Sequence, residues 1–276
     1  MIPIGTDRQT EHFPIATVAL IVLNCLVFAV ELVLGWSLVE NPLVLNPDHF
    51  YPWQPITALF AHAGLLHLGG NMLFLWIFGS HAEDALGAKR YLAIYLVAGL
   101  AATGLETLVS FVAAHEVVGG LGASGAIMGV LALFVLRFPQ VKVRFFYWFY
   151  YVYYGTWLVE ARWVALFYVG MDLLAGLWQV AMGDLGGVGH WAHLGGFAAG
   201  AVAAFKLDLP EEAAEDAARD EIGRLAASGA LSLAAAKAIE EADKSPSDVA
   251  LQELAAAQCA ASAFTSAEYL PSSSDR

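Results

Sequence analysis

Residues 14–36 read PIATVALIVLNCLVFAVELVLGW, an apolar run of 23 residues with one acidic side chain, Glu31. A helix of about 20 apolar residues crosses the roughly 30 Å hydrocarbon core of a bilayer. Comparable runs recur along the chain at about 57–80, 91–113, 123–139, 163–182 and 188–206. The sequence therefore predicts an all-α polytopic membrane protein built as a six-helix transmembrane bundle.

The composition of the whole chain agrees with a membrane protein. Of its 276 residues, 59% are hydrophobic and 14% are charged, against about 45–50% and 25% in soluble domains. The net charge is −13, and an acidic chain without a basic patch is not expected to bind nucleic acid. Cys25 and Cys259 lie far apart in the chain, so neither a disulfide nor a cysteine metal site is predicted.

Acidic residues concentrate in the C-terminal part of the chain. Residues 207–276 hold 14 acidic and 5 basic side chains, whereas residues 1–206 hold 12 and 8. We therefore predict a membrane domain over 1–206 and an acidic, Ala-rich cytoplasmic tail over 207–276, mostly helical and disordered at its end. A small interaction module and a loosely ordered tail both remain open. The candidate core residues of the tail are Ile222, Leu225, Leu231, Leu233, Ile239, Leu251 and Leu254.

The lysines and arginines predict the orientation of the spans. None lies in the links 37–56, 114–122 and 183–187, which we therefore place outside, with both termini in the cytoplasm. The first span is expected to be an uncleaved anchor. Residues 145–159 are short for a span and rich in Tyr and Trp, which favour the membrane interface. We expect an interfacial element there, and a seventh span is the alternative.

The second predicted span contains three polar side chains, His62, His67 and Asn71. Polar groups inside apolar spans usually face the interior of a bundle, often at a functional site. His67 and Asn71 are four residues apart and share one helical face, so both can point into a cavity as hydrogen-bond donors. His62 lies off that face. Interhelical hydrogen bonding that fixes packing is the alternative interpretation.

The fourth predicted span begins with a glycine-rich stretch, Gly122-Ala123-Ser124-Gly125. Ser124 stands where this loop enters a helix, whose N-terminal N–H groups can stabilise a developing oxyanion. The alternative is that Ser124 only caps the helix.

The sixth predicted span can supply a base for this serine. A serine hydroxyl is a weak nucleophile that needs an adjacent base, and His193 begins a span on the same side of the membrane. Gly125-x3-Gly129 and Gly196-x3-Gly200 would let the two helices approach closely. A histidine that is merely satisfied beside a glycine packing seam is the alternative.

In combination, these motifs resemble the rhomboid family of intramembrane serine proteases. The resemblance covers about 190 residues, from the N-terminus to Gly200. It is specific as a set: His62-x4-His67-x3-Asn71, Gly122-x-Ser124-Gly125 and Ala192-His193-x2-Gly196-x3-Gly200.

The resemblance implies a role for each of these residues. Ser124 would be the nucleophile and His193 the general base, a dyad with no third carboxylate. His67, Asn71 and the backbone N–H of Ser124 would form the oxyanion hole. No metal or cofactor is implied. Residues expected to support the site structurally are His62, Gly122, Gly125, Gly196 and Gly200.

The resemblance also implies a substrate and a location. The substrate would be a transmembrane segment of another protein, cut near its external end. We expect a multi-pass protein of the bacterial plasma membrane, in contact with the lipid bilayer and of unpredicted oligomeric state. A catalytically silent relative that binds membrane clients is the alternative function. A transporter is disfavoured because the two halves show no repeat.

Three departures from the family pattern need an explanation. Trp53-Gln54 stands where the family often has Trp-Arg, and Met128 stands where some members have a Tyr that stacks on the catalytic histidine. Asp172 is an acid without an evident partner in the fifth span. Glu31 and Glu106 pose the same question in the first and third spans.

Overall fold

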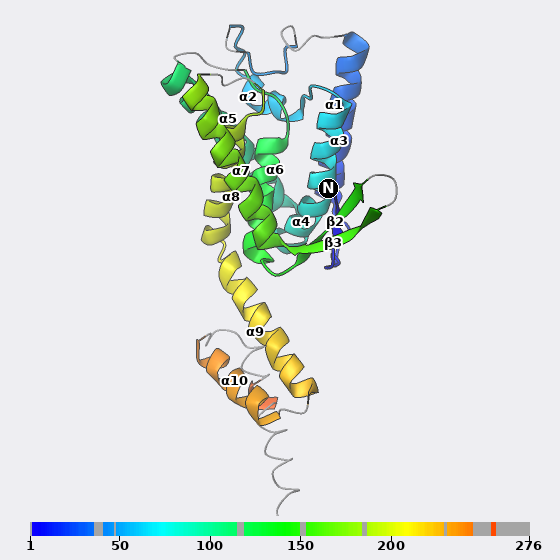
Figure 1. Cartoon of the computed structure of the whole chain (residues 1–276), viewed down its shortest axis with the longest axis vertical. Helices are drawn as coiled ribbons and strands as arrows, with labels where there is room; N and C mark the ends of the chain where they lie inside the picture. Colours follow the sequence, from blue (N-terminus) through cyan, green and yellow to red (C-terminus); the bar gives the residue numbers. More distant parts are fainter. Residues whose placement is uncertain are drawn as a thin grey trace, which may run out of the picture. The chain divides into compact units, whose positions relative to one another are not determined.

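A computed structural model describes residues 2–35, 41–46, 48–114, 119–149, 153–183, 187–228, 231–244 and 255–257. The chain divides into two compact units, Met1–Leu209 and Pro210–Arg276 (Figure 1). Cys259 and the Ser272–Ser274 stretch lie outside the described residues.

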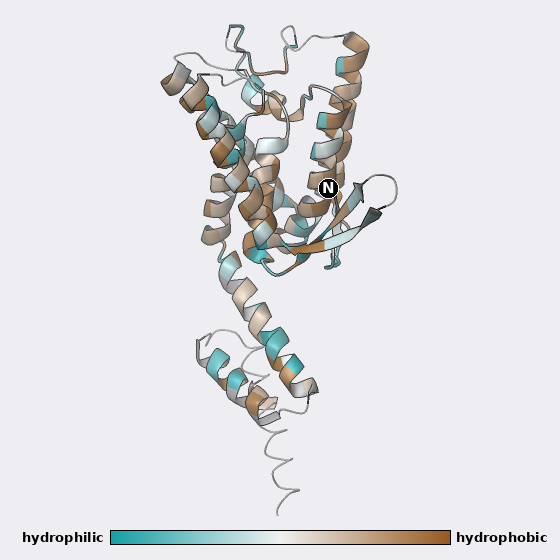
Figure 2. Ribbon diagram, viewed as in Figure 1, coloured by the Kyte–Doolittle hydropathy of each residue, from teal (hydrophilic) through white to brown (hydrophobic). Residues whose placement is uncertain are grey.

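The first unit is mostly helical, and its helical surface is largely apolar (Figure 2). In chain order its helices are α1 (Ile15–Leu34), α2 (Gln54–Thr57), η1 (Ala58–Phe60), α3 (Leu65–Phe74), η2 (Leu75–Gly79), α4 (Ser80–Leu86), α5 (Ala88–Ala114), α6 (Ser124–Arg137), α7 (Ala161–Met182) and α8 (His190–Lys206).

Several of these helices have the length and hydropathy of membrane spans. Helices α1, α5 and α7 do so individually, and the segment from α2 to α4 does so as one span broken by a 90° bend. Helices α6 and α8 are shorter, at 14 and 17 residues. The described chain thus contains three such helices, or four with the bent pair, and the count of six spans stays a prediction.

Helix α6 is the central helix of this unit. Every residue from Gly125 to Val135 is buried, and the helix packs against α5 and α8. Fourteen helical residues extend about 21 Å, less than the roughly 30 Å of a hydrocarbon core. Helix α6 is therefore too short to cross the hydrocarbon core by itself.

The first unit also contains a β-sheet, so the prediction of an all-α protein was wrong. Strands β1 (Ile2–Thr6), β2 (Lys142–Phe149) and β3 (Tyr153–Glu160) form an antiparallel sheet in the order β1-β2-β3. The aromatic residues that suggested an interfacial element also favour pleated strands, where they pair across the ladder. The described part of 145–159 is therefore not a seventh transmembrane helix, and its location at the membrane interface stays a prediction.

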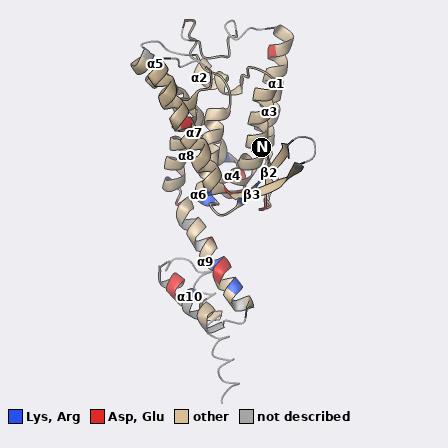
Figure 3. Cartoon of the chain, viewed as in Figure 1, with Lys and Arg blue, Asp and Glu red and all other residues tan. Residues whose placement is uncertain are grey.

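The basic residues of the first unit lie at one end. Arg137 ends α6, and the sheet follows it directly (Figure 3). The start of α1 belongs to the same end, because it is hydrogen-bonded to α4. The basic residues at this end are Arg8, Lys89, Arg90, Arg137, Lys142, Arg144, Arg162 and Lys206. This asymmetry is the one on which the predicted cytoplasmic location of both termini rests.

A buried carboxylate closes the first turn of α1. Glu83 of α4 accepts hydrogen bonds from the backbone N–H groups of Ala16 and Thr17, both at 2.8 Å, and from the Thr17 hydroxyl at 2.9 Å. The first N–H groups of a helix have no partner within it, and a negative charge is favourable there. Glu83 therefore fixes the sheet end of α1 to α4.

The second unit contains α9 (Leu209–Ala227) and α10 (Leu231–Lys244). Ile222 is fully buried against Ala234, Ala238 and Ala255, as expected for a core position. Leu233 and Ile239 are exposed, so the prediction that they belong to the core was wrong. Leu251 and Leu254 lie outside the described residues.

Replacing Glu83 should destabilise the first unit. In the Glu83→Ala variant two buried amides lose their acceptor, which we expect to lower the free energy of unfolding by on the order of 2–4 kcal/mol. The thermal unfolding midpoint in detergent measures this loss. Glu11→Ala is the matched control because the Glu11 side chain is exposed. Equal midpoints for the two variants would contradict the role assigned to Glu83.

Candidate active site

The loop before α6 is fixed by backbone hydrogen bonds. Gly120 and Leu45 exchange N–H···O bonds of 3.0 and 3.1 Å, and the N–H of Gly122 donates to the carbonyl of Ala58 at 2.7 Å. Helix α6 then begins at Ser124. Its N-cap residue is Ala123, and no side chain caps the helix. The alternative that Ser124 serves as the helix cap is therefore wrong, and its hydroxyl is free for another use.

Glycines bring α6 and α8 into backbone contact. A Cβ atom on Gly196 would overlap the backbone of Gly125, and one on Gly200 would overlap the backbone of Gly129. A Cβ on Gly125 would itself overlap the side chain of Ala102 on α5. Small residues at these positions are what permits such close packing. The contact fixes the first turn of α6 beside the first turn of α8, which contains His193.

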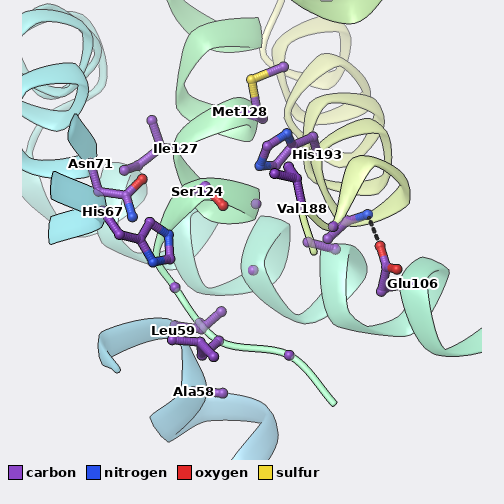
Figure 4. Close-up of a pocket in the computed structure, with 18 of the residues that line it drawn as sticks. Ala58, Leu59, His67, Asn71, Glu106, Ser124, Ile127, Met128, Val188 and His193 are labelled. Atoms are coloured by element: carbon purple, nitrogen blue, oxygen red, sulfur yellow. Dashed lines mark hydrogen bonds between the residues drawn. The ribbon is translucent and has the colours of Figure 1, made fainter. Parts of the chain in front are cut away.

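Ser124 and His193 line the same cavity, which has a volume of about 800 Å³. His67 and Asn71 line it from α3. In Figure 4, Ser124 lies between these two side chains on one side and His193 on the other. No hydrogen bond joins Ser124 to His193 among the described residues. The four site residues predicted from three distant motifs therefore meet in one place.

Two side chains in this cavity, Asn71 and His67, can donate a hydrogen bond to a ligand. The Asn71 amide nitrogen is buried and has no hydrogen-bond partner, which costs free energy unless a ligand supplies an acceptor. The Nδ1 atom of His67 accepts the N–H of Ala63 at 3.4 Å, so the proton of the neutral ring lies on Nε2. A Cβ on Gly122 would lie 2.9 Å from that Nε2, so a larger residue there would displace the ring.

His62 and Glu31 support His67 from the loop side. The His62 ring is buried and meets the His67 ring edge-on, with centroids 5.1 Å apart. The Glu31 carboxylate accepts the Asn41 amide at 2.6 Å and the His62 N–H at 3.4 Å. Glu31, which had no explanation in the sequence, thus ties the end of α1 to the loops over the site.

Gln54 stands at the position where the family often has an arginine. Its side chain is 1% exposed, and its carbonyl oxygen accepts the N–H groups of Tyr51 and Asn46 at 3.1 and 3.3 Å. Its amide donates to the carbonyl of His49 at 3.2 Å. A neutral side chain therefore replaces the arginine in organising this loop.

Two acids hold the first turn of α8. Glu106 of α5 accepts the N–H of Ala192 at 2.8 Å (Figure 4), which satisfies one open amide of the helix terminus. Asp172 of α7 is buried, and its Oδ1 lies 3.0 Å from the Nδ1 of His193 and 2.7 Å from the Nδ1 of His190. A carboxylate therefore lies in contact with the predicted base, which the predicted Ser124–His193 dyad did not include.

His190 and Asp172 were not among the predicted site residues. Their ligand atoms and that of His193 lie within 4.8 Å of one another, a spacing that would suit a metal ion. The Nδ1 atom of each ring contacts Asp172 Oδ1 directly, and a metal ion in this cluster would have to replace those hydrogen bonds. One feature of the sequence could have identified this cluster: Asp172 is a lone acid in an apolar span, and such a residue usually has a buried partner.

The Rhomboid domain family model matches residues 49–208, more than half of the chain. The chain belongs to the rhomboid family. With its apolar helices, it is a multi-pass membrane protein of this family, and the family resemblance seen in the motifs is confirmed.

Curated relatives carry the same family name. Rhomboid protein 1, mitochondrial, of Saccharomyces cerevisiae is 32% identical over 51% of this chain and 45% of its own length. Rhomboid-type serine protease 2 of Emericella nidulans is 30% identical over 76% of this chain and 35% of its own. The human presenilin-associated rhomboid-like protein, mitochondrial, is 36% identical over 32% of this chain and 23% of its own.

These matches span less than half the length of each of the three relatives. Two of the three are mitochondrial by name. The relatives therefore support a location in a membrane. They do not support the bacterial plasma membrane that was expected from the sequence.

Replacing a glycine of the α6–α8 contact with a larger residue should disrupt the site. In Gly196→Ala the new methyl group must push the two helices apart, so we expect a lower unfolding midpoint and slower labelling of Ser124 by a fluorophosphonate. Gly104→Ala is the matched control, because a Cβ there meets nothing within 4 Å and alanine favours the helix. Equal labelling and stability of both variants would argue against the close contact.

Proposed function

We propose that the chain is an intramembrane serine endopeptidase. Ser124 is its nucleophile, His193 is its general base, and His67, Asn71 and the Ser124 N–H stabilise the oxyanion. The observation that supports this most strongly is the cavity that Ser124 and His193 share with an unpaired buried amide donor. Because buried polar groups usually have a hydrogen-bond partner, the unpaired Asn71 amide is available to a carbonyl oxygen in the cavity.

The chemistry follows from this arrangement. The Ser124 Oγ attacks the carbonyl carbon of the scissile peptide bond while His193 takes the hydroxyl proton. The negative charge moves to the carbonyl oxygen, where donors from α3 and from the first turn of α6 stabilise it. His193 then returns the proton to the leaving amine, and water hydrolyses the acyl-enzyme with His193 again acting as base.

The substrate is a transmembrane segment of another protein, cut near its external end. The cavity is lined in part by loops at the end opposite the basic residues. A peptide bond within a helix is already hydrogen-bonded, so the scissile bond is reached most readily in a locally unwound segment. Six spans with both termini in the cytoplasm agree with this arrangement. The sheet of β1, β2 and β3 then lies at the cytoplasmic interface, where its exposed Trp and Tyr side chains are favourable.

Removing either member of the dyad should abolish cleavage. We expect Ser124→Ala and His193→Ala to fold, with unfolding midpoints near that of the wild type, and to cut no substrate. The assay follows proteolysis of a transmembrane segment containing a glycine-rich stretch, with purified protein in detergent and in proteoliposomes. Cleavage by Ser124→Ala would refute the assignment of the nucleophile.

The same assay decides between the two classes of function. A fluorophosphonate should label Ser124 in the wild type and fail to label the Ser124→Ala variant. If the folded wild type neither cut the substrate nor reacted with the fluorophosphonate, the chain would be a client-binding rhomboid relative and not an enzyme.

Loss of one oxyanion donor should reduce the rate without abolishing it. We expect Asn71→Ala to lower kcat by about 10²–10³-fold with little change in KM, because the lost hydrogen bond strengthens only in the transition state. Asn24→Ala is the control, since Asn24 is also a buried asparagine of the bundle but does not line the cavity. Equal kcat values for the two variants would contradict the assignment of Asn71 to the oxyanion hole.

A further inference from the structure

Asp172 is the acid that contacts the proposed general base, His193, and the role assigned to it below rests on the proposed function. We propose that Asp172 is a positioning residue that turns the Ser124–His193 pair into a serine–histidine–aspartate triad. Asp172 comes from α7, while Ser124 and His193 come from α6 and α8. Three helices therefore contribute to one catalytic unit.

The hydrogen bond to Asp172 decides which nitrogen of His193 can act as a base. An ionised carboxylate only accepts hydrogen bonds, so the contact of 3.0 Å between Asp172 Oδ1 and His193 Nδ1 requires the proton on Nδ1. The lone pair of the neutral ring is then on Nε2. That is the tautomer that a base needs when the nucleophile faces its other nitrogen.

The same carboxylate stabilises the charged state of the base during the reaction. When His193 takes the Ser124 proton, its ring becomes an imidazolium, and Asp172 lies in direct contact with it. The side chain of Asp172 is 10% exposed, so little water competes for its charge. Charge-assisted hydrogen bonds in such surroundings are stronger than those between neutral groups.

His190 holds the carboxylate itself in place. Its Nδ1 lies 2.7 Å from the same Oδ1, and its ring is perpendicular to that of His193, with centroids 6.3 Å apart. Asp172 is thus fixed by a second donor from the same turn of α8. This arrangement restricts the rotation of the carboxylate and, through it, of the His193 ring.

Met128, one turn after Ser124, gives an independent reason why His193 needs an acceptor for its Nδ1 proton. Met128 lies beside His193 in the cavity (Figure 4), and a thioether offers neither a strong acceptor for Nδ1 nor an aromatic face to stack on. Among the described residues, the acceptor within hydrogen-bond distance of the His193 ring is Asp172. The orientation of the base therefore depends on α7.

Substitution of Asp172 tests this role. An asparagine can donate its amide to Nδ1 and so favour the tautomer with the proton on Nε2. For Asp172→Asn we expect kcat to fall by roughly 10- to 10³-fold, a part of the about 10²–10⁴ supplied by a general base. KM and the unfolding midpoint should remain close to the wild-type values. Fluorophosphonate labelling of Ser124 should slow by a similar factor, because it reports nucleophile activation without a protein substrate.

Two further variants separate positioning from structural support. Asp172→Glu keeps the carboxylate and should recover part of the lost kcat. Asp208→Asn makes the same chemical change at an exposed acid outside the cavity and should leave kcat unchanged. A wild-type unfolding midpoint in Asp172→Glu with kcat no higher than in Asp172→Asn would overturn the proposal and leave Asp172 a packing residue.

The outcome also distinguishes this proposal from the proposed function. Wild-type kcat and labelling in Asp172→Asn, with Ser124→Ala inactive, would overturn the triad and leave a dyad protease. A folded wild type that neither cuts the substrate nor reacts with the fluorophosphonate would overturn both.

Discussion

The contact between α6 and α8 is the constraint on which the site depends. Gly125 and Gly129 face Gly196 and Gly200 so closely that no side chain fits between them. Hydrophobic burial cannot drive association between helices in lipid, so the distance between them is set by van der Waals packing and small residues. Because Ser124 and His193 each lie within a few residues of this contact, helix packing also sets the geometry of the reacting groups.

The acids within the apolar spans have a common physical explanation. Glu83 closes the first turn of α1, Glu106 that of α8, and Glu31 accepts an N–H group from the loop beside α3. Each carboxylate supplies acceptors where backbone amides have no helical partner and little water is available. The polar site is surrounded by helix termini and loops, whose backbone N–H groups have no acceptor within a helix. These acids supply the missing acceptors.

The sequence predicted those features that depend on periodicity, composition and local motifs. The apolar runs indicated the helices, and the spacing of His67 and Asn71 correctly predicted that both face one cavity. The sheet was missed because a run of Tyr, Phe and Trp fits both a membrane interface and a β-hairpin. The pairing of β2 with β3 and with Ile2–Thr6 decides between them. The partners of Asp172 were missed for a similar reason: residues 172 and 190 lie on different helices, and their contact depends on tertiary packing.

The position of Asp172 on α7 has a consequence for how the active site can work. Helices α6 and α8 are joined through backbone contact, whereas α7 contributes its acid through side-chain hydrogen bonds to His190 and His193. One side of α7, including Leu174 and Trp178, is extensively exposed, whereas α6 is buried along most of its length. A displacement of α7 would lengthen the bond to His193 before it altered the distance between α6 and α8. The orientation of the base is thus coupled to the position of α7, whereas the nucleophile lies on the buried helix α6.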